Sequence, residues 1–172
     1  ANSMLNFATQ YKAAPGSTFK MVSATAGLME NVITLKDTIT CVGTFREITP
    51  SPKCWATYGH GRENLTTAIR DSCNYFFYEV GYRVGIDVIY KYAKYFGLDD
   101  KTGIELSHEA SGKAAQQSSA AEMGGWYVAD TLNAAIGQGY NSFSPIQMAQ
   151  YVATIANGGK RIRPTIIKSV VK

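Results

Sequence analysis

Ser17 and Lys20 are the two residues whose types and spacing most directly suggest covalent chemistry. A hydroxyl is a poor nucleophile until a base removes its proton, and a lysine amine can be that base where burial or a nearby cation lowers its pKa. Three positions apart on a helix, the two side chains share one face and can meet. Ser17 follows the turn signal Pro15-Gly16 and is a candidate helix N-cap, where backbone N–H groups stabilise negative charge. Alone, the pattern is weak, because an N-cap serine followed by an exposed lysine looks the same.

A second set of reactive side chains is formed by all three cysteines and one of the two histidines, which are Cys41, Cys54, His60 and Cys73. An odd number of cysteines argues against a complete set of disulfides. Three thiolates and one imidazole make a closed, four-ligand Zn²⁺ site that leaves no open position for chemistry. The stretch therefore predicts a structural zinc site. A Cys41–Cys54 disulfide with a buried Cys73 and three unlinked thiols are the alternatives.

The composition bounds the kind of protein that carries these residues. The 172 residues are 45% hydrophobic and 17% charged, which is typical of one folded domain and excludes a disordered, highly charged chain. The net charge is +4, and the lysines and arginines are scattered, so no nucleic-acid partner is expected. No apolar run is long enough to span a membrane, and residues 1–10 lack the features of a signal peptide.

The chain reads as mainly helical. Apolar periodicity and capping residues predict helices over 17–30, 64–70, 74–84, 86–96 and 145–157. A short extended piece is expected at 32–37, an irregular loop at 40–62, and a flexible surface connection at 107–125. Residues 164–172 read as a strand with no partner left in the chain, so we expect a piece of a longer protein.

A series of ordered sequence blocks then gives the serine motif a family context. Residues 14–20, Ala-Pro-Gly-Ser-Thr-Phe-Lys, resemble the sequence around the active serine of penicillin-binding protein transpeptidases. The remaining blocks follow in the family's order: Gly59-His60-Gly61, Ser72-Cys73-Asn74, 102–106 (Thr-Gly-Ile-Glu-Leu), 136–139 (Ile-Gly-Gln-Gly), 144–149 (Ser-Pro-Ile-Gln-Met-Ala) and 155–159 (Ile-Ala-Asn-Gly-Gly). The resemblance covers essentially the whole chain and is strongest to class B members of the elongation type, called penicillin-binding protein 2.

The resemblance implies the α+β penicillin-binding-protein transpeptidase fold, which is similar to that of serine β-lactamases. It implies that residues 1–172 are a partial domain, the helical middle, with most of the sheet outside the chain. The family's third motif, Lys-Thr-Gly or Lys-Ser-Gly, lies on a strand beyond the Ile-Ala-Asn-Gly-Gly block and is absent here. Lys101-Thr102-Gly103 precedes the Ile-Gly-Gln-Gly block and is a decoy.

The resemblance also implies roles for individual residues. Ser17 becomes the nucleophile that forms an acyl-enzyme, and Lys20 its base. Ser72 relays a proton towards the leaving group, and Asn74 holds Lys20 and the substrate amide; the alternative for both is a helix cap. The backbone N–H of Ser17 supplies one oxyanion donor. Gly137, Gln138 and Gly139, from the Ile-Gly-Gln-Gly block, shape the floor of the substrate groove, with plain packing as the alternative.

In the intact protein, the implied activity is cross-linking of peptidoglycan stem peptides as a D,D-transpeptidase, a reaction that needs no cofactor and that β-lactams block. Its expected partners are stem peptides, β-lactams, the rest of the domain and a glycosyltransferase of the elongation machinery. The expected location is the outer face of the cell membrane, with an anchoring helix outside this chain. Some related class B members carry zinc between the first two motifs, where Cys73 would fix its neighbours Ser72 and Asn74. The alternatives are a serine β-lactamase or β-lactam sensor domain, and a non-catalytic zinc-stabilised helical module.

Overall fold

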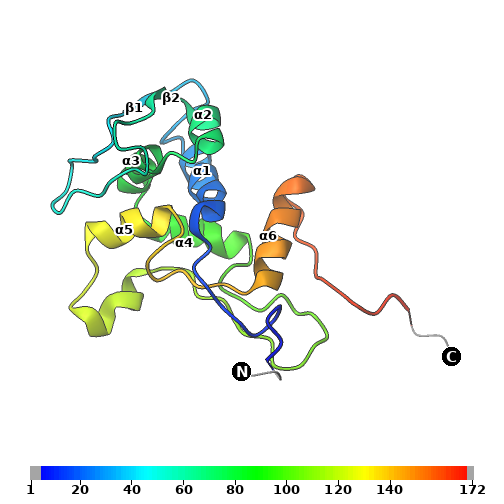
Figure 1. Cartoon of the computed structure of the whole chain (residues 1–172). Helices are drawn as coiled ribbons and strands as arrows, with labels where there is room; N and C mark the ends of the chain where they lie inside the picture. Colours follow the sequence, from blue (N-terminus) through cyan, green and yellow to red (C-terminus); the bar gives the residue numbers. More distant parts are fainter. Residues whose placement is uncertain (1–4, 170–172) are drawn as a thin grey trace.

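The computed structural model describes residues 5–169, and this part of the chain is mainly helical (Figure 1). Its elements are, in chain order, a 3-10 turn η1 (Gly16–Phe19), α1 (Lys20–Met29), β1 (Ile39–Cys41), β2 (Gly61–Glu63), α2 (Leu65–Arg70), α3 (Asn74–Val84), α4 (Ile86–Tyr95), a second 3-10 turn η2 (Gln117–Met123), α5 (Val128–Ala135) and α6 (Pro145–Ala156). Between residues 5 and 169, no helix has the length and apolar character needed to cross a membrane.

The helix that carries the Ser-x-x-Lys motif starts later than the sequence predicts. Ser17 lies inside η1, the N-cap positions of η1 and α1 are Pro15 and Phe19, and the expected serine N-cap is therefore wrong. The α-helical part begins at Lys20 and ends at Met29. Its inner face is buried and includes Val22 and Ala26, which follow the predicted helical spacing.

The other predicted helices are confirmed. Asn64 caps α2 through a reciprocal pair of hydrogen bonds with Thr67, and α3 has the predicted bounds. Helix α4 ends at Tyr95, and Gly97 follows it with a φ of +80°, the left-handed conformation that closes helices. Helix α6 ends one residue before the predicted position.

Expectations about two less regular segments are wrong. Residues 32–37 form no strand, and the predicted flexible connection at 107–125 contains the turn η2. Helix α5 was not expected from the sequence. In the predicted terminal strand, residues 164–169 pair with no other strand, as expected of a strand without a partner in the chain, and residues 170–172 lie outside the described part of the chain.

The predicted irregular loop at 40–62 is closed at its base by a two-stranded antiparallel sheet. Ile39 pairs with Glu63 and Cys41 pairs with Gly61. Inside the loop, the amide of Cys54 donates to the Gly43 carbonyl at 2.7 Å. These pairings bring Cys41, Cys54 and His60 close together in space.

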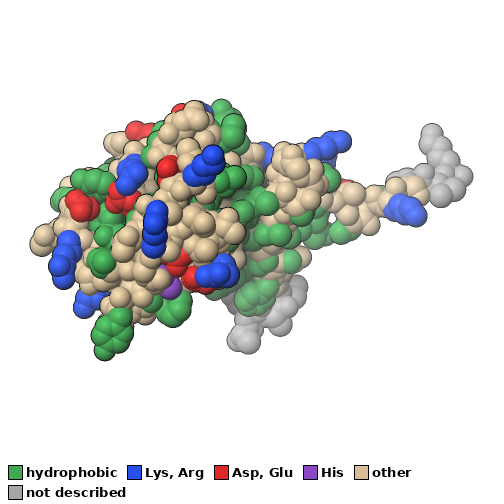
Figure 2. Space-filling model, turned by 90° about the horizontal axis from the view of Figure 1, so that it is seen from above, with side chains coloured by type: hydrophobic (Ala, Val, Ile, Leu, Met, Phe, Trp, Pro, Cys, Tyr) green, Lys and Arg blue, Asp and Glu red, His purple; other side chains and the backbone are tan. Residues whose placement is uncertain are grey.

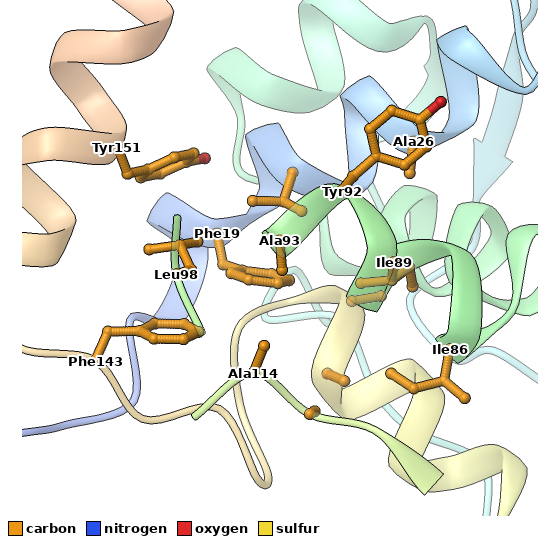
Figure 3. Packing of buried hydrophobic residues seen from close by; sticks show 14 residues of the cluster. Phe19, Ala26, Ile86, Ile89, Tyr92, Ala93, Leu98, Ala114, Phe143 and Tyr151 are labelled. Carbon is orange, nitrogen blue, oxygen red and sulfur yellow. The ribbon is translucent and has the colours of Figure 1, made fainter. Parts of the chain in front are cut away.

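Two buried hydrophobic clusters hold the helices together, and α3 packs against both α1 and α5. The first cluster lies between α1, α4 and α6, where Figure 3 shows Phe19, Phe143 and Tyr151 on one side of Ile89 and Ala93. The second surrounds α3 and contains Phe45, Leu65, Phe76, Phe77 and Leu132 together with all three cysteines. The cysteine segment is therefore part of the core.

Acidic and basic side chains are interspersed on the face that Figure 2 shows, with no extended field of one sign. This agrees with the scattered lysines and arginines of the sequence.

Candidate active site

The exposed Ser17 is presented by a turn that is held from several sides. The Gly16 amide donates to the Gly137 carbonyl at 2.9 Å, and the Tyr151 hydroxyl donates to the Thr18 carbonyl at 3.0 Å. Tyr151 is fully buried, so its hydroxyl links the turn to α6 from inside the core. Ser17 therefore sits on a fixed support while its side chain is open to solvent.

Lys20 points into the molecule and uses all three of its N–H donors. Its Nζ donates to the Ser72 carbonyl at 2.8 Å, to Ser72 Oγ at 3.0 Å and to Asn74 Oδ1 at 2.6 Å. The residue is only 3% exposed. The first turn of α1 and the segment before α3 are therefore joined through one amine, which brings the first and second sequence motifs together.

The environment of Lys20 shifts its acid–base equilibrium. Burial lowers the pKa of the Lys20 ammonium from its ordinary value of 10.5 to about 8, because the charged form loses hydration. The thiolate forms of Cys54 and Cys73 oppose this shift of the pKa. The Phe77 ring, 5.6 Å from Nζ, also favours the cation. With this pKa, roughly one tenth of the amine is neutral at pH 7.

Ser72 connects the other two polar groups. Its hydroxyl donates to Ser17 Oγ at 2.9 Å and accepts from Lys20 Nζ. Among the hydrogen bonds of residues 5–169, Lys20 and Ser17 are linked through Ser72 and not directly. The sequence predicted a direct meeting of the two side chains, which assumed that both lie on one regular helix; the 3-10 turn at Ser17 changes that geometry.

Ser72 and Asn74 do not act as caps, which was the alternative for both. The N-cap of α3 is Cys73, whose Sγ accepts from the Phe76 amide at 3.4 Å. Ser72 has a φ of +50°, a left-handed conformation that residues other than glycine rarely adopt. The backbone here is turned so that Ser72 and Asn74 face Lys20 while Cys73 is buried.

The three residues predicted to shape the groove floor differ in their surroundings. Gly137 is buried directly behind the serine turn, and a Cβ at its position would lie 2.1 Å from the Gly16 carbonyl oxygen. Gln138 and Gly139 are exposed. Gly137 therefore has a packing role that supports the serine turn, and Gln138 and Gly139 are the two that a ligand can reach.

The predicted metal ligands lie together. Donor atoms of Cys41, Cys54, His60 and Cys73 are all within 4.8 Å of one another, and all three cysteines are buried free thiols, so the Cys41–Cys54 disulfide is not formed. Burial raises the pKa of the Cys73 thiol. At Cys54, burial raises the pKa, but backbone N–H donors, including that of Tyr75, together hold it below its ordinary value.

Trp55 is a residue of this site that sequence reasoning missed. Its indole N–H lies 3.2 Å from the carbonyl oxygens of both Asp71 and Ser72, and its ring packs edge-on against His60 at a centroid distance of 4.9 Å. The available signal was its position, directly after Cys54 in the predicted metal stretch.

The decoy segment Lys101-Thr102-Gly103 makes its contacts elsewhere. The Thr102 hydroxyl and the amides of Thr102 and Gly103 donate to the buried carboxylate of Glu109. The Gly103 carbonyl accepts from Arg163. These bonds explain the Lys-Thr-Gly sequence as a structural loop.

Comparison with known proteins gives the site a family. Residues 1–172 match the family described as "Penicillin binding protein transpeptidase domain". Peptidoglycan D,D-transpeptidase MrdA of Escherichia coli strain K12 is 34% identical over 174 residues, which cover 98% of this chain and 27% of the relative. The chain thus spans about a quarter of the length of the curated relatives it matches.

Two solved structures show the same arrangement of the chain. A complex between PBP2 and MreC from Helicobacter pylori matches with a TM-score of 0.90 and 32% identity, over 95% of this chain and 31% of that one. The penicillin G acyl-enzyme of penicillin-binding protein A from M. tuberculosis matches with a TM-score of 0.80 and 27% identity, over 94% and 36% of the two chains.

Proposed function

Because this chain belongs to the penicillin binding protein transpeptidase domain family, we propose that the protein containing it is a peptidoglycan D,D-transpeptidase of the elongation type. The predicted family and fold are confirmed by the match over residues 1–172 and by the structural similarity. What the residues of this chain do in the reaction is part of the proposal.

The hydrogen-bonded chain from Lys20 through Ser72 to Ser17 is the observation that supports this function most strongly. It joins a nucleophile, a hydroxyl that can both donate and accept, and an amine whose pKa is lowered to about 8 by burial. Hydroxyl protons rotate, so donation along the chain can reverse. A proton leaving Ser17 Oγ can then pass to Ser72 while the Ser72 proton passes to neutral Lys20.

The proposed reaction has two acyl-transfer steps. Ser17 Oγ forms a bond to the carbonyl carbon of the penultimate D-Ala, the bond to the terminal D-Ala nitrogen breaks, and the leaving amine takes up the proton. The amine of a second stem peptide then attacks the ester and releases Ser17, which regains its proton. Asn74, which already accepts from Lys20 Nζ, positions that amine and the substrate amide.

The backbone N–H of Ser17 is the proposed oxyanion donor on this chain. We propose that residues 1–172 are the helical part of the domain, and that the second donor and the third motif come from sequence outside it. The fact that the chain covers 27% of its E. coli relative supports this division. Residues 1–172 alone are then inactive.

We further propose a structural zinc ion at Cys41, Cys54, His60 and Cys73. Tetrahedral zinc with bonds of about 2.3 Å to sulfur and about 2.0 Å to nitrogen places a sulfur and a nitrogen about 3.5 Å apart. Cys54 Sγ and His60 Nδ1 are 3.6 Å apart, so the side chains fit the ion. His60 Nε2 is buried without a hydrogen-bond partner among residues 5–169, and the Trp55 ring packs against the imidazole. Four protein ligands leave no open position, so the ion would stabilise the loop and supply no chemistry to the acyl transfer.

Metal analysis of protein purified without added zinc tests the metal proposal. We expect about one zinc ion per chain, lost when Cys54 and Cys73 are replaced by serine. A metal content near zero in folded, unsubstituted protein would contradict it.

The proposed partners are peptidoglycan stem peptides, β-lactams and, for the whole protein, a glycosyltransferase of the elongation machinery at the outer face of the cell membrane. The acyl-enzyme structure of the M. tuberculosis protein supports β-lactam acylation, and the H. pylori PBP2 was solved with MreC. For this chain, both kinds of partner are inferred from family membership.

Mass spectrometry of the full-length protein after incubation with benzylpenicillin tests the function. We expect one stable penicilloyl adduct on Ser17 and none on the Ser17→Ala variant, which keeps the rest of the site. Rapid turnover of a chromogenic cephalosporin would favour a β-lactamase instead. The absence of any adduct would favour a non-catalytic module and refute the proposal.

A further inference from the structure

Trp55 has a position that packing alone does not explain. Its side chain is 65% exposed, although an indole gains stability chiefly by leaving water. Its N–H nevertheless points at the protein, shared between the Asp71 and Ser72 carbonyl oxygens at 3.2 Å each. Its ring and that of His60 form a T-shaped pair. Most of the residue stays in solvent while its N–H donor is bound.

The group that Trp55 contacts is a backbone under strain. Ser72 has a φ of +50°, and a residue other than glycine in that region is strained and persists only where its surroundings hold it. Two donors converge on the Ser72 carbonyl, Trp55 Nε1 at 3.2 Å and Lys20 Nζ at 2.8 Å. A carbonyl oxygen has two lone pairs, so the two donors together saturate it.

The hydrogen bonds of Lys20 weaken during the proposed reaction. Lys20 must give up a proton to act as a base, and the neutral amine then accepts from Ser72 Oγ and keeps two uncharged N–H donors for the Ser72 carbonyl and Asn74 Oδ1, which bind less strongly than those of the ammonium. The indole N–H of Trp55 does not titrate, so its bonds to Ser72 and Asp71 persist in both protonation states of Lys20.

We propose that Trp55 is a positioning residue for Ser72. It fixes the strained peptide so that Ser72 Oγ stays between Ser17 and Lys20 when Lys20 loses its proton. Trp55 acts through Ser72 and does not touch the reacting atoms. This inference rests on the proposed function, because it assigns a role within the same site.

The test uses two tryptophan-to-phenylalanine variants of the full-length protein. Trp55→Phe removes the donor and keeps an aromatic ring beside His60. Trp126→Phe is the matched control, because Trp126 is half-buried and its N–H donates to Thr131 Oγ1 at 2.9 Å. Stopped-flow acylation with a fluorescent penicillin separates the dissociation constant of the first complex from the rate constant of acylation.

We expect Trp55→Phe to lower the acylation rate constant about fivefold to tenfold, the factor that the loss of one net hydrogen bond gives. The dissociation constant, the zinc content and the fraction of protein that reacts should stay within twofold of the unsubstituted values. Trp126→Phe should leave the rate constant unchanged. A purely structural role would instead lower the reacting fraction and leave the rate constant of the remainder intact.

An acylation rate constant for Trp55→Phe within twofold of the unsubstituted value would overturn the proposal and leave the proposed function standing. If Trp55→Phe does not fold, Trp55 is replaced by 3-benzothienylalanine, which keeps the ring shape and lacks the N–H. This variant must show the same fivefold to tenfold loss in the acylation rate constant. Normal acylation of this variant would also overturn the positioning proposal. Unsubstituted protein that never reacts at Ser17 would overturn both proposals together.

Discussion

The pH dependence of Ser17 acylation gives the sharpest test of how this site works. If neutral Lys20 is the base, the rate constant of acylation follows the fraction of neutral amine. With a pKa of about 8, that fraction is roughly one tenth at pH 7 and roughly nine tenths at pH 9. The acylation rate should therefore rise about tenfold between pH 7 and pH 9 and then level off. A lysine at its ordinary value of 10.5 would instead give a rate that keeps rising beyond pH 10.

A substitution next to the Lys20 amine should raise its pKa and move the midpoint of the pH profile in a known direction. Asn74 Oδ1 accepts from Lys20 Nζ at 2.6 Å, so Asn74→Asp places a negative charge in contact with the amine without changing the shape of the side chain. An adjacent opposite charge favours the ammonium and raises its pKa by about 1–3 units. The midpoint of the profile should move upward by that amount, and acylation at pH 7 should fall about tenfold or more.

The measurement is the stopped-flow rate constant for penicillin acylation of the full-length protein between pH 6 and pH 10, corrected for hydrolysis of the free penicillin. Lys12→Ala is a matched control, because Lys12 is an exposed lysine whose Nζ donates to the Ser111 carbonyl. A profile that is flat between pH 7 and pH 9, or an Asn74→Asp midpoint at the unsubstituted value, would refute the assignment of Lys20 as the base.

Two further predictions concern the supports of the site. Cys73→Ala leaves Ser72 and Asn74 in place but should slow penicillin acylation about tenfold in the full-length protein and release the proposed zinc ion. Unchanged acylation would show that the cysteine cluster is independent of the reaction. Gly137→Ala brings a Cβ to 2.1 Å from the Gly16 carbonyl oxygen at a φ of +77°. Gly158→Ala is the control, because Gly158 has a φ of +79° and open space around it. We expect Gly137→Ala to destabilise the fold by about 1–3 kcal/mol more than Gly158→Ala. Chemical denaturation of both variants measures the difference, and equal losses would mean that the serine turn tolerates the added methyl group.

The sequence predicted those parts of the structure that depend on local pattern. Helix α3 has both predicted ends because its apolar face repeats at helical spacing and its neighbour Gly85 separates it from α4. The four residues of the cysteine cluster were found because their side-chain types limit what they can do together, and the structure brings them within 4.8 Å.

The parts that the sequence missed depend on partners far away in the chain. Ser17 was expected to cap its own helix, but its hydroxyl accepts from Ser72, 55 positions later. The role of Trp55 depends on a carbonyl 17 positions away, which no local pattern encodes. Helix α5 was missed because its capping residue is Tyr127, which is outside the usual set of serine, threonine, aspartate and asparagine. The sheet between β1 and β2 has three residues per strand, too few to show an alternating pattern.

The tripeptide Ser72-Cys73-Asn74 belongs to two environments at once, since its middle side chain is in the core and its outer two face Lys20. Substitutions that adapt the core around this cysteine therefore also move the two polar groups. Variants selected to evade an inhibitor through this segment would carry a cost in thermal stability, and variants selected for heat resistance would carry a cost in reactivity. Stability and turnover are thus constrained to evolve jointly in this family member.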